Sequence, residues 1–231
     1  MNQIAIIQEK AEPGRKQPAR IIGVSRRSIT GRAMVGQLSV PFESALERDL
    51  LVILDFDTSV RRVRSQPLRV DWLDALGRRR RYTPDFLVEH HAAAPALIEV
   101  KYRADFWAEW PAAKPRYRAA RRHARESGML FSILTEVEIR GSYLDNVVFL
   151  RGYRGRPAHE AHEETLVHAL AALGEATPQA LLLAAYASEG NRMHALAPLW
   201  RLVATRQVCA DLSVPLTMRS AIWVPAGEVP Q

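Results

Sequence analysis

The sequence predicts an α/β protein in which a mixed β-sheet is flanked by helices and followed by a smaller, mainly helical domain. Three observations lead to this prediction. Apolar, strand-like segments alternate with turns between residues 60 and 101. An amphipathic helical segment precedes them, and a long helix-forming segment follows them. After Arg156 the composition changes, and three segments of helical length appear.

Charge is distributed unevenly along the 231 residues, whose formal net charge is +7. Residues 1–154 contain 27 Lys and Arg against 18 Asp and Glu, whereas residues 155–231 contain 5 against 7. We therefore expect the first part to face a polyanion and the second part to bind protein rather than DNA. The one cysteine, Cys209, excludes an intramolecular disulfide and a thiolate metal site.

The N-terminal part predicts an arm and then a helix. Residues 1–40 are rich in Gly, Pro and basic side chains, which indicates a basic arm that is partly ordered or follows a phosphate backbone. A helix is expected to begin at Pro41, because proline is tolerated in a first helical turn. Its buried stripe recurs at helical spacing and consists of Leu46, Leu50, Ile53 and Leu54.

A sheet domain is expected over residues 41–154. Its predicted strands are residues 60–72, 78–88, 97–101, 129–134 and 147–150. Short turns join the first three strands, which predicts an antiparallel meander. A helix over residues 105–127, broken at Pro111 or Pro115, separates the third strand from the fourth, and this order predicts a parallel crossover.

Residues 155–231 predict the smaller domain. Its helices are expected at residues 160–173, 177–187 and 193–205, and its strands at residues 207–210 and 221–224. Thr177 followed by Pro178 is typical of a helix start, with a capping hydroxyl and a proline at the first position. Three helices followed by a small hairpin are the order of a winged helix.

Chemically useful residues gather on the predicted strands 78–88 and 97–101. Asp85 follows a proline in the first, and Glu99 and Lys101 share a face of the second, because side chains alternate along a strand. A hairpin of the two strands brings these groups to one edge. Hard oxygen ligands of this kind bind Mg²⁺, and the set suits phosphodiester hydrolysis. The alternative is an edge strand that simply turns Glu99 and Lys101 toward solvent.

In a two-metal nuclease each group would have a role. Asp85 can bridge the two ions, and Glu99 with the backbone carbonyl of Val100 can complete one of them. Glu47, at the edge of the helical stripe, can complete the other. Lys101 can orient the attacking water and offset charge on the phosphorus.

The polar residues around this centre leave alternatives open. Gln66 either orients a carboxylate or the substrate phosphate, or is a buried amide that the backbone satisfies. Glu43 is expected to lie on a solvated face. Several arginines form either a surface for the DNA backbone or a charged edge that discourages aggregation. These arginines are Arg62, Arg64, Arg78, Arg79, Arg80 and Arg81.

These motifs resemble a known nuclease signature. Pro84-Asp85 followed by Glu99-Val100-Lys101 is similar to the PD-(D/E)xK pattern of restriction-endonuclease-like nucleases. Together with the segments 42–49, 66–67 and 82–88, the pattern resembles the TnsA family of transposon-end endonucleases over roughly residues 20–150. The resemblance implies a restriction-endonuclease-like fold. It matches acidic metal ligands to Glu47, Asp85 and Glu99, and the catalytic lysine to Lys101.

The resemblance also implies a function and partners. It implies a Mg²⁺-dependent endonuclease, with Mn²⁺ able to substitute, that cleaves double-stranded DNA at transposon 5′ ends in the bacterial cytoplasm. A DDE transposase (TnsB-like) would cut the 3′ ends, and an AAA+ regulator (TnsC-like) would contact the C-terminal domain. No membrane partner is expected, because no apolar run approaches the ~20 residues of a membrane span. Two alternatives stay open, a stand-alone restriction- or repair-type nuclease and a non-cleaving adaptor that binds DNA or a partner.

Overall fold

The computed structural model describes residues 29–225 of the chain. The chain divides into two compact units, the first ending at Ile139 and the second beginning at Arg140. The predicted division between residues 154 and 155 therefore lies too late in the sequence. Of the predicted basic arm, residues 1–28 lie outside the described residues, and the remainder belongs to a hairpin of the first unit.

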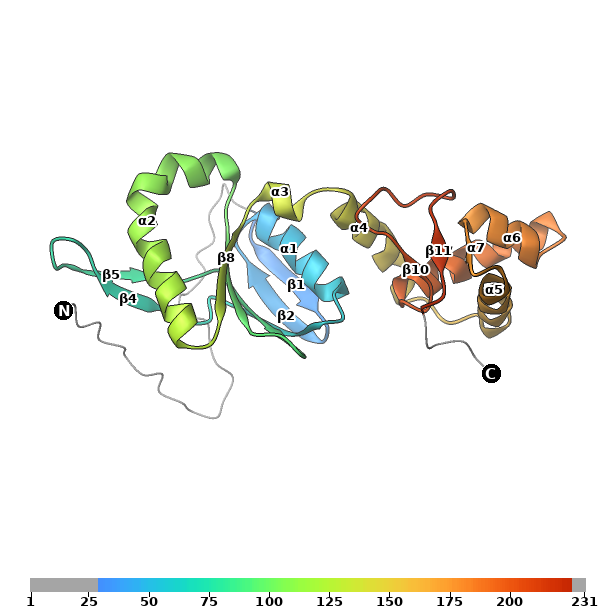
Figure 1. The fold of residues 1–231 in the computed structure, drawn as a ribbon, viewed down its shortest axis with the longest axis horizontal. Helices are drawn as coiled ribbons and strands as arrows, with labels where there is room; N and C mark the ends of the chain where they lie inside the picture. Colours follow the sequence, from blue (N-terminus) through green and yellow to red (C-terminus); the bar gives the residue numbers. More distant parts are fainter. Residues whose placement is uncertain (1–28, 226–231) are drawn as a thin grey trace. The chain divides into compact units, whose positions relative to one another are not determined.

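A four-stranded mixed sheet forms the centre of the first unit (Figure 1). Its strands lie in the order β3 (Val60–Ser65), β6 (Phe86–His90), β7 (Ala96–Val100) and β8 (Leu130–Leu134). The pairs β3–β6 and β6–β7 are antiparallel, and β7–β8 is parallel. Helix α2 (Arg103–Glu126) joins β7 to β8, so the predicted parallel crossover is confirmed.

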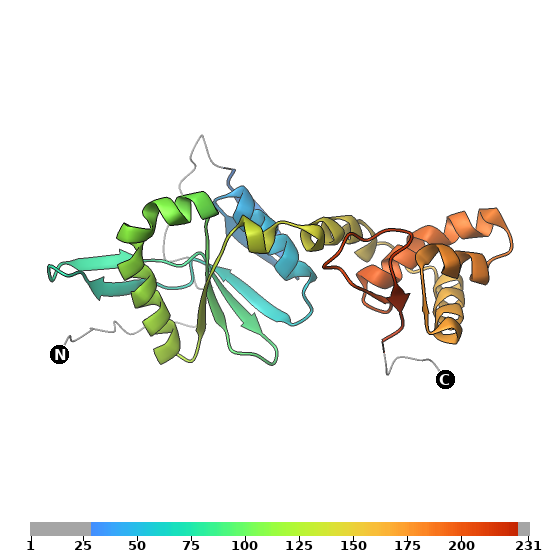
Figure 2. The ribbon, with the colours of Figure 1, turned by 45° about the horizontal axis from the view of Figure 1, so that its top comes forward.

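Helices cover both faces of this sheet (Figure 2). Alternating side chains divide between the two faces. Phe86, Val88 and Ile98 pack into the core beneath α1 (Ala45–Phe56). Leu87 and Leu97 pack with Ala124 of α2 on the other face. Full burial of each such side chain stabilises the fold by roughly 1.5–3 kcal/mol. The first core also includes residues of the hairpin β1 (Gly31–Val35) and β2 (Leu38–Phe42), and of the short helix α3 (Glu136–Ile139).

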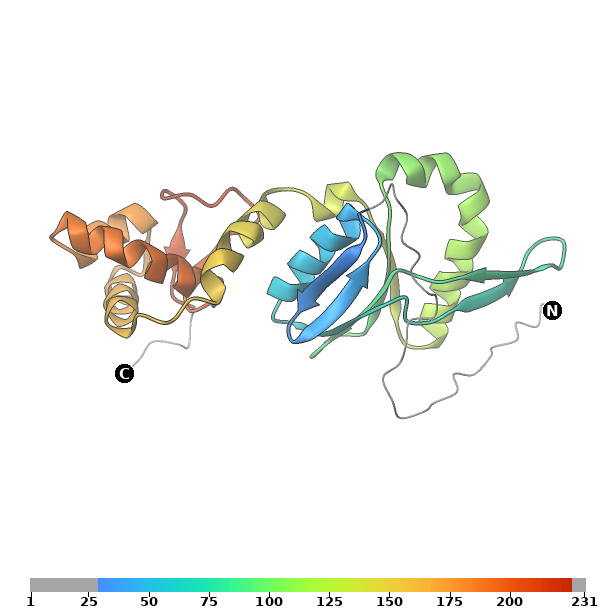
Figure 3. The same ribbon diagram turned by 180° about the vertical axis from the view of Figure 1, so that it is seen from behind.

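A second hairpin leaves the sheet between β3 and β6. It consists of β4 (Val70–Leu73) and β5 (Arg79–Tyr82), which form a separate two-stranded sheet that projects from the unit (Figure 3). The backbone of Gln66, with a φ of 45°, turns the chain out of β3. The long strands predicted over residues 60–72 and 78–88 are therefore each split in two. The predicted antiparallel order of the three segments is confirmed by β3, β6 and β7, and the projecting hairpin is the part that was not predicted.

The ends and the course of the first two helices also differ from expectation. Pro41 lies in β2, and α1 begins only after Ser44, whose side chain accepts a hydrogen bond from the backbone N–H of Glu47. Helix α2 is continuous through Pro111 and Pro115, where a break was predicted. It bends along its length instead (Figure 2), as proline in a helix interior commonly causes.

The second unit combines helices with a small sheet. Its elements in order are α4 (Ser142–Arg154), α5 (Glu160–Leu173), β9 (Glu175–Ala176), α6 (Pro178–Ala185), α7 (Glu189–Ala204), β10 (Cys209–Ala210) and β11 (Ile222–Trp223). The sheet has the order β10-β11-β9, and both pairs are antiparallel. Thr177 caps α6 as predicted, and the three predicted helices are present. Among residues 29–225, no helix is long and apolar enough to cross a membrane.

The strand predicted at residues 147–150 is wrong, because these residues lie inside α4. Val147 and Leu150 are both fully buried and three positions apart, a spacing that places them on one side of a helix. A four-residue apolar run is compatible with either a strand or a buried helix. With α4 included, residues 140–231 contain eight Lys and Arg against eight Asp and Glu, so the second unit is neutral rather than acidic.

Candidate active site

The carboxylates of the candidate site lie where β6 and β7 meet. The register pairs Phe86 with Ile98 and Leu87 with Leu97, and its continuation sets Asp85 opposite Glu99. Because side chains alternate, both carboxylates lie on the face that carries Leu87 and Leu97, which is the face covered by α2. The predicted hairpin thus brings its two acidic residues together.

A backbone hydrogen bond fixes the side chain of Asp85. Its Oδ2 accepts a hydrogen bond from the N–H of Val100 at 2.7 Å. The neighbouring N–H, that of Lys101, donates in the opposite direction to the carbonyl of Leu134 at 3.0 Å. In an extended strand the N–H and C=O of one residue point to the same side. The carbonyl of Val100 therefore faces the side of Asp85, as its predicted role requires.

Glu99 is buried, with 8% of its surface exposed, and is held by a tyrosine. The hydroxyl of Tyr82 donates to Glu99 Oε2 at 2.6 Å. Tyr82 lies at the end of β5, so the projecting hairpin contributes one group to the site. Burial, followed by the charge of Glu99, raises the pKa of Tyr82 far above its usual range, so the hydroxyl stays a donor.

The pKa values of both carboxyl groups are raised. Burial raises the pKa of Asp85 well above its ordinary value, and the charges of Glu99 and then Glu47 raise it further. Burial also raises the pKa of Glu99, although the hydrogen bond from Tyr82 and the charges of Arg116 and Lys101 oppose this shift. Carboxylates in such surroundings favour either a shared proton or a nearby cation.

Glu47 belongs both to the site and to the start of α1. Its Oε1 accepts a hydrogen bond from Ser44 Oγ at 2.9 Å, and its Oε2 accepts one from the N–H of Glu43 at 2.9 Å. With the reverse bond from the Glu47 N–H to Ser44 Oγ, this is similar to a capping box, except that the acid accepts from the N–H of the residue before the N-cap. Its charge nevertheless acts on Asp85. Glu47 thus lies beside the site, and helix capping accounts for part of its role.

Gln66 links Asp85 to Glu43. Its backbone N–H donates to the Asp85 carbonyl at 2.7 Å, and its Nε2 donates to Glu43 Oε1 at 3.2 Å. Glu43 precedes α1, and its carboxylate accepts a hydrogen bond from the buried side-chain amide of Gln66. The sequence instead predicted that Glu43 lies on a solvated helix face. Gln66 Oε1 is buried, and no group among the described residues donates to it. The side-chain amide of Gln66 therefore contacts a carboxylate, as the first alternative expects, and no backbone group bonds it among the described residues.

Lys101 is held by an acidic residue of α2. Its Nζ lies 2.6 Å from Glu109 Oε2, and Arg116 Nη2 lies 3.1 Å from the same oxygen. Arg116 also donates to the hydroxyl of Tyr117 at 3.0 Å. The lysine side chain is about one-fifth exposed, at 19%, and thus does not simply point into solvent as the edge-strand alternative assumed.

The predicted arginine surface is divided between two sheets. Arg62 and Arg64 lie on β3 of the main sheet, and Arg64 forms an ion pair with Glu89 at 3.2 Å. The run Arg78–Arg81 lies at the tip and on the second strand of the projecting hairpin, so it is not adjacent to β3. Asp74 binds the Nε atoms of Arg78 and Arg80 at 3.0 and 2.9 Å. All four arginines of the run are exposed.

Three residues of the site were not predicted, namely Tyr82, Glu109 and Arg116. Tyr82 lies three residues before Asp85, at the end of the arginine run, and a lone aromatic there is a weak signal. Glu109 and Arg116 are seven residues apart on α2, two helical turns, so they share a face. Only the packing of α2 on the sheet shows that this face meets Lys101.

The donor set suits a metal ion that takes part of its coordination from substrate and water. Among residues 29–225, no three His, Cys, Asp or Glu side chains form a cluster that could hold a metal by itself. Asp85 and Glu99 provide a pair of carboxylates, and the Val100 carbonyl faces the same side. Mg²⁺ is usually bound through one or two carboxylates together with phosphates and waters. The buried, unneutralised surroundings that raise the pKa of Asp85 agree with a cation bound at this pair.

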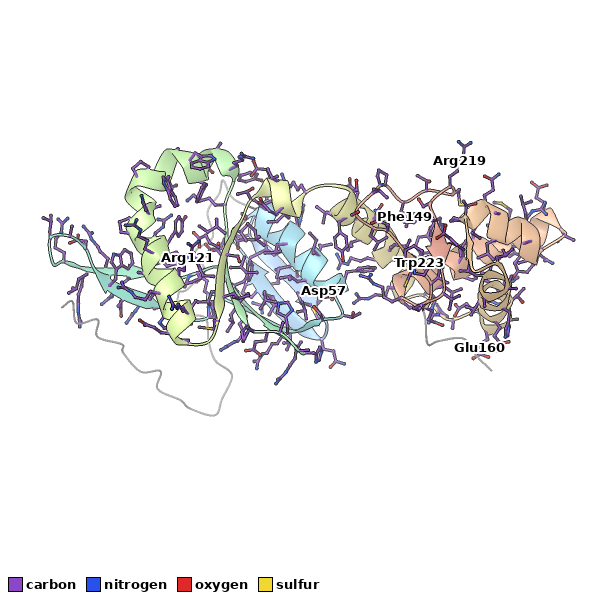
Figure 4. All side chains as sticks on the ribbon, viewed as in Figure 1. Asp57, Arg121, Phe149, Glu160, Arg219 and Trp223 are labelled. Atoms are coloured by element: carbon purple, nitrogen blue, oxygen red, sulfur yellow. The ribbon has the colours of Figure 1, made fainter. Side chains whose placement is uncertain are left out.

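One segment of the chain is similar to a known protein family. Residues 57–136 match the family model of the TnsA-like endonuclease N-terminal domain. No curated protein matches the chain significantly. The matched segment begins at Asp57, at the end of α1 (Figure 4), and includes Asp85, Glu99 and Lys101 but not Glu47. The resemblance predicted from the motifs is confirmed for residues 57–136, which are similar to the N-terminal domain of TnsA-like endonucleases.

Proposed function

We propose that the protein is a metal-dependent DNA endonuclease of the TnsA type that hydrolyses phosphodiester bonds at transposon 5′ ends. The observation that carries the proposal is the placement of Asp85 opposite Glu99, with Val100 and Lys101 beside them. This arrangement lies inside the segment that matches TnsA-like endonucleases.

The proposed cofactor is Mg²⁺, with Mn²⁺ able to substitute. Asp85, Glu99 and the Val100 carbonyl would hold it, and Glu47 would support a second ion. When bound, the metal would supply a Lewis acid and lower the pKa of an attacking water. The chain keeps these donors oriented through the Val100 N–H on Asp85 and the Tyr82 hydroxyl on Glu99.

Lys101 would act on the substrate directly. Its Nζ lies on the same face of β7 as Glu99, because the two residues are two positions apart. An ammonium group there can neutralise a phosphate oxygen and stabilise the charge that develops in the transition state. In the structure a carboxylate of α2 already binds this ammonium group at 2.6 Å, which supports an anion-binding role for it.

The exposed arginines would bind the DNA backbone without reading sequence. Arg79 is the clearest candidate, since it is exposed on β5 and no ion pair of Arg79 occurs among the described residues. Arg62 is also exposed, on β3, and would contribute in the same way. Arg64, Arg78, Arg80 and Arg81 would contribute less, because carboxylates already bind them.

We assign the second unit a winged-helix-like fold and a docking role toward the AAA+ regulator. The order helix, strand, helix, helix, strand, strand and the sheet order β10-β11-β9 support this fold. The arginines of α7 already have partners within the unit. Arg201 binds both oxygens of Glu163 at 3.0 and 2.7 Å, and Arg192 binds the carbonyls of Tyr186 and Ala187. This disfavours α7 as a helix that reads DNA.

A strand-resolved cleavage assay tests the proposal. The wild type and Asp85→Ala would each be mixed with double-stranded transposon ends, the DDE transposase and the AAA+ regulator of the same element, and Mg²⁺. We expect Asp85→Ala to lose 5′ cleavage while 3′ cleavage by the transposase persists. Unchanged 5′ cleavage would contradict the assignment. Strong cutting of DNA by the isolated protein would favour the stand-alone nuclease. If 5′ cleavage did not require this protein, the adaptor alternative would be favoured.

A further inference from the structure

The carboxylate of Glu109 lies between two cations at the candidate site. Lys101 Nζ and Arg116 Nη2 approach the same oxygen, Oε2, at 2.6 and 3.1 Å. Lys101 comes from the end of β7, whereas Glu109 and Arg116 both come from α2. One anionic oxygen held by an ammonium and a guanidinium is also the way proteins bind a phosphate oxygen.

Arg116 is placed to serve the same site as Lys101. Its charge acts on Glu99, and its guanidinium lies over the ring of Tyr117 at 4.9 Å. Its Nε is buried, and no acceptor for it occurs among the described residues. Guanidinium groups present several donors in a fixed plane and bind phosphate through two of them. Arg116 therefore retains donor capacity beyond its contact with Glu109.

The contact with Glu109 is one that a stronger anion can replace. Glu109 is the most exposed of the three groups, at 47%, against 19% for Lys101 and 30% for Arg116. Exposed ion pairs contribute only about 0–1 kcal/mol. The two cations lower the pKa of Glu109, chiefly through the hydrogen bond from Lys101, so the group is ionised at neutral pH. The carboxylate lies at the solvent side, and the cations lie further in.

We propose that Glu109 occupies the place of a DNA phosphate, and that Arg116 is a second phosphate-binding residue beside Lys101. Glu109 is a positioning residue that keeps the two cations together until a phosphate group of DNA displaces it. This inference rests on the proposed endonuclease function. It adds Arg116 to the residues that contact the substrate. It also implies that Glu109 weakens DNA binding.

The first test observes the ammonium group of Lys101 directly. The chain has four lysines, Lys10, Lys16, Lys101 and Lys114, so NMR of the lysine Nζ groups is simple to assign. We expect Glu109→Gln to shift the Lys101 signal, and inorganic phosphate to shift it at lower concentration in this variant than in the wild type. Equal responses of the two proteins to phosphate would overturn the proposal. Glu126→Gln, at the other exposed end of α2, is the control.

The second test measures affinity for a fluorescent DNA duplex in EDTA, which prevents cleavage. Glu109→Gln should bind up to about fivefold more tightly, the equivalent of an ion pair of about 1 kcal/mol. Arg116→Gln should bind more weakly and lower the slope of log K against log salt by about 0.9. The matched control is Arg219→Gln, which removes an exposed arginine of the second unit (Figure 4).

The outcomes separate this inference from the proposed function. Glu109→Gln binding DNA as the wild type does, with Arg116→Gln no weaker than Arg219→Gln, would overturn the phosphate site even if the wild type cleaves 5′ ends. A wild type that cleaves neither strand in the reconstituted reaction would instead contradict the endonuclease proposal. In both tests circular dichroism shows that each variant is folded.

Discussion

Asp85 and Glu99 are buried carboxyl groups, and their ionisation lowers the stability of the folded chain at neutral pH. Their pKa values are raised in the folded state, mainly by burial. The unfolded chain therefore releases these protons at a lower pH than the folded chain does. The stability that the protonated groups contribute is complete below the unfolded pKa and is lost as the pH rises through the folded pKa.

Asp85→Asn should consequently stabilise the protein at neutral pH without divalent metal. The amide removes the buried charge and keeps an acceptor for the Val100 N–H. We expect a gain on the order of 1 kcal/mol, visible as a rise of a few degrees in Tm. The gain should shrink at acidic pH, where the wild type keeps its protons, and in Mg²⁺, which compensates the wild-type charge.

Asp74→Asn is the control for this prediction. Its hydrogen bonds from Arg78 and from Arg80 lower the pKa of Asp74 in the folded state. The stability it contributes is present above the unfolded pKa and is lost as the pH falls through the folded pKa. Its removal should therefore lower Tm at neutral pH, opposite in sign to Asp85→Asn. Two variants that shift Tm in the same direction would refute the electrostatic account.

Glu47 and Ser44 can be separated by mutation, because they share a cap but not a role. Ser44→Ala should cost about 1 kcal/mol of stability through the loss of the N-cap, with 5′ cleavage retained in the folded protein. Glu47→Gln keeps one of the two acceptor oxygens and remains a helix former, so it should lower Tm less than Ser44→Ala does and reduce cleavage about tenfold or more. Thermal melts and the strand-resolved assay measure both. Full cleavage by Glu47→Gln would assign this residue to capping alone.

The spacing of Asp85, Glu99 and Lys101 was enough to predict that they meet, because strand alternation and one hairpin determine it. The partners of these residues were beyond local pattern. Tyr82 reaches Glu99 only because a hairpin inserts before β6, and Glu109 reaches Lys101 only because α2 packs over the sheet. Such contacts depend on tertiary structure, which residue spacing within one element does not encode.

The hairpin β4–β5 offers a matched pair of arginines for testing DNA binding. Asp74 binds the side chain of Arg78, whereas no ion pair of Arg79 occurs among the described residues. Arg79→Gln should weaken binding of duplex DNA and lower the salt slope by about 0.9, and Arg78→Gln should have a smaller effect. Affinity measured at several salt concentrations distinguishes them. Equal effects would show that the pairing with Asp74 does not limit Arg78.

Elements were predicted best where capping and periodicity agree. Thr177-Pro178 predicted the start of α6 correctly, and the recurring Leu46, Leu50 and Leu54 predicted the buried stripe of α1. The helix start predicted at Pro41 is wrong, because proline also fits an edge strand; Ser44 with Glu47 three residues later is the better signal. The backbone of Gln66 is left-handed and separates β3 from β4. The sequence did not predict this turn, because the position is not a glycine or an asparagine, the residues that commonly adopt a positive φ.

The division into two units predicts that each folds by itself. The first unit has its own core around Phe86 and Leu97, and the second has buried leucines in α5 and α7. We expect fragments 1–139 and 140–231 each to unfold cooperatively in thermal melts followed by circular dichroism. A cut after residue 154, the boundary predicted from composition, should leave the second fragment less stable, because it removes α4. Equal stability of fragments 140–231 and 155–231 would contradict this.

The net charge of the second unit depends on where the boundary between the two units lies. The second unit is neutral over residues 140–231, so its proposed docking role rests on the internal contacts of the α7 arginines rather than on acidity. The change in composition predicts a second domain, but it places the domain boundary one helix too late in the sequence. Helix α4 contains arginines, so its composition is similar to that of the basic first unit.

Binding of Mn²⁺ tests most directly whether Asp85 and Glu99 act as one cation site. Electron paramagnetic resonance titrations would compare the wild type, Asp85→Asn and Glu99→Gln, with Asp74→Asn in the turn of the projecting hairpin as a control. We predict that the wild type and the control bind Mn²⁺ alike, and that both site variants lose more than about tenfold in affinity. Wild-type affinity in Asp85→Asn and Glu99→Gln would contradict the proposed site.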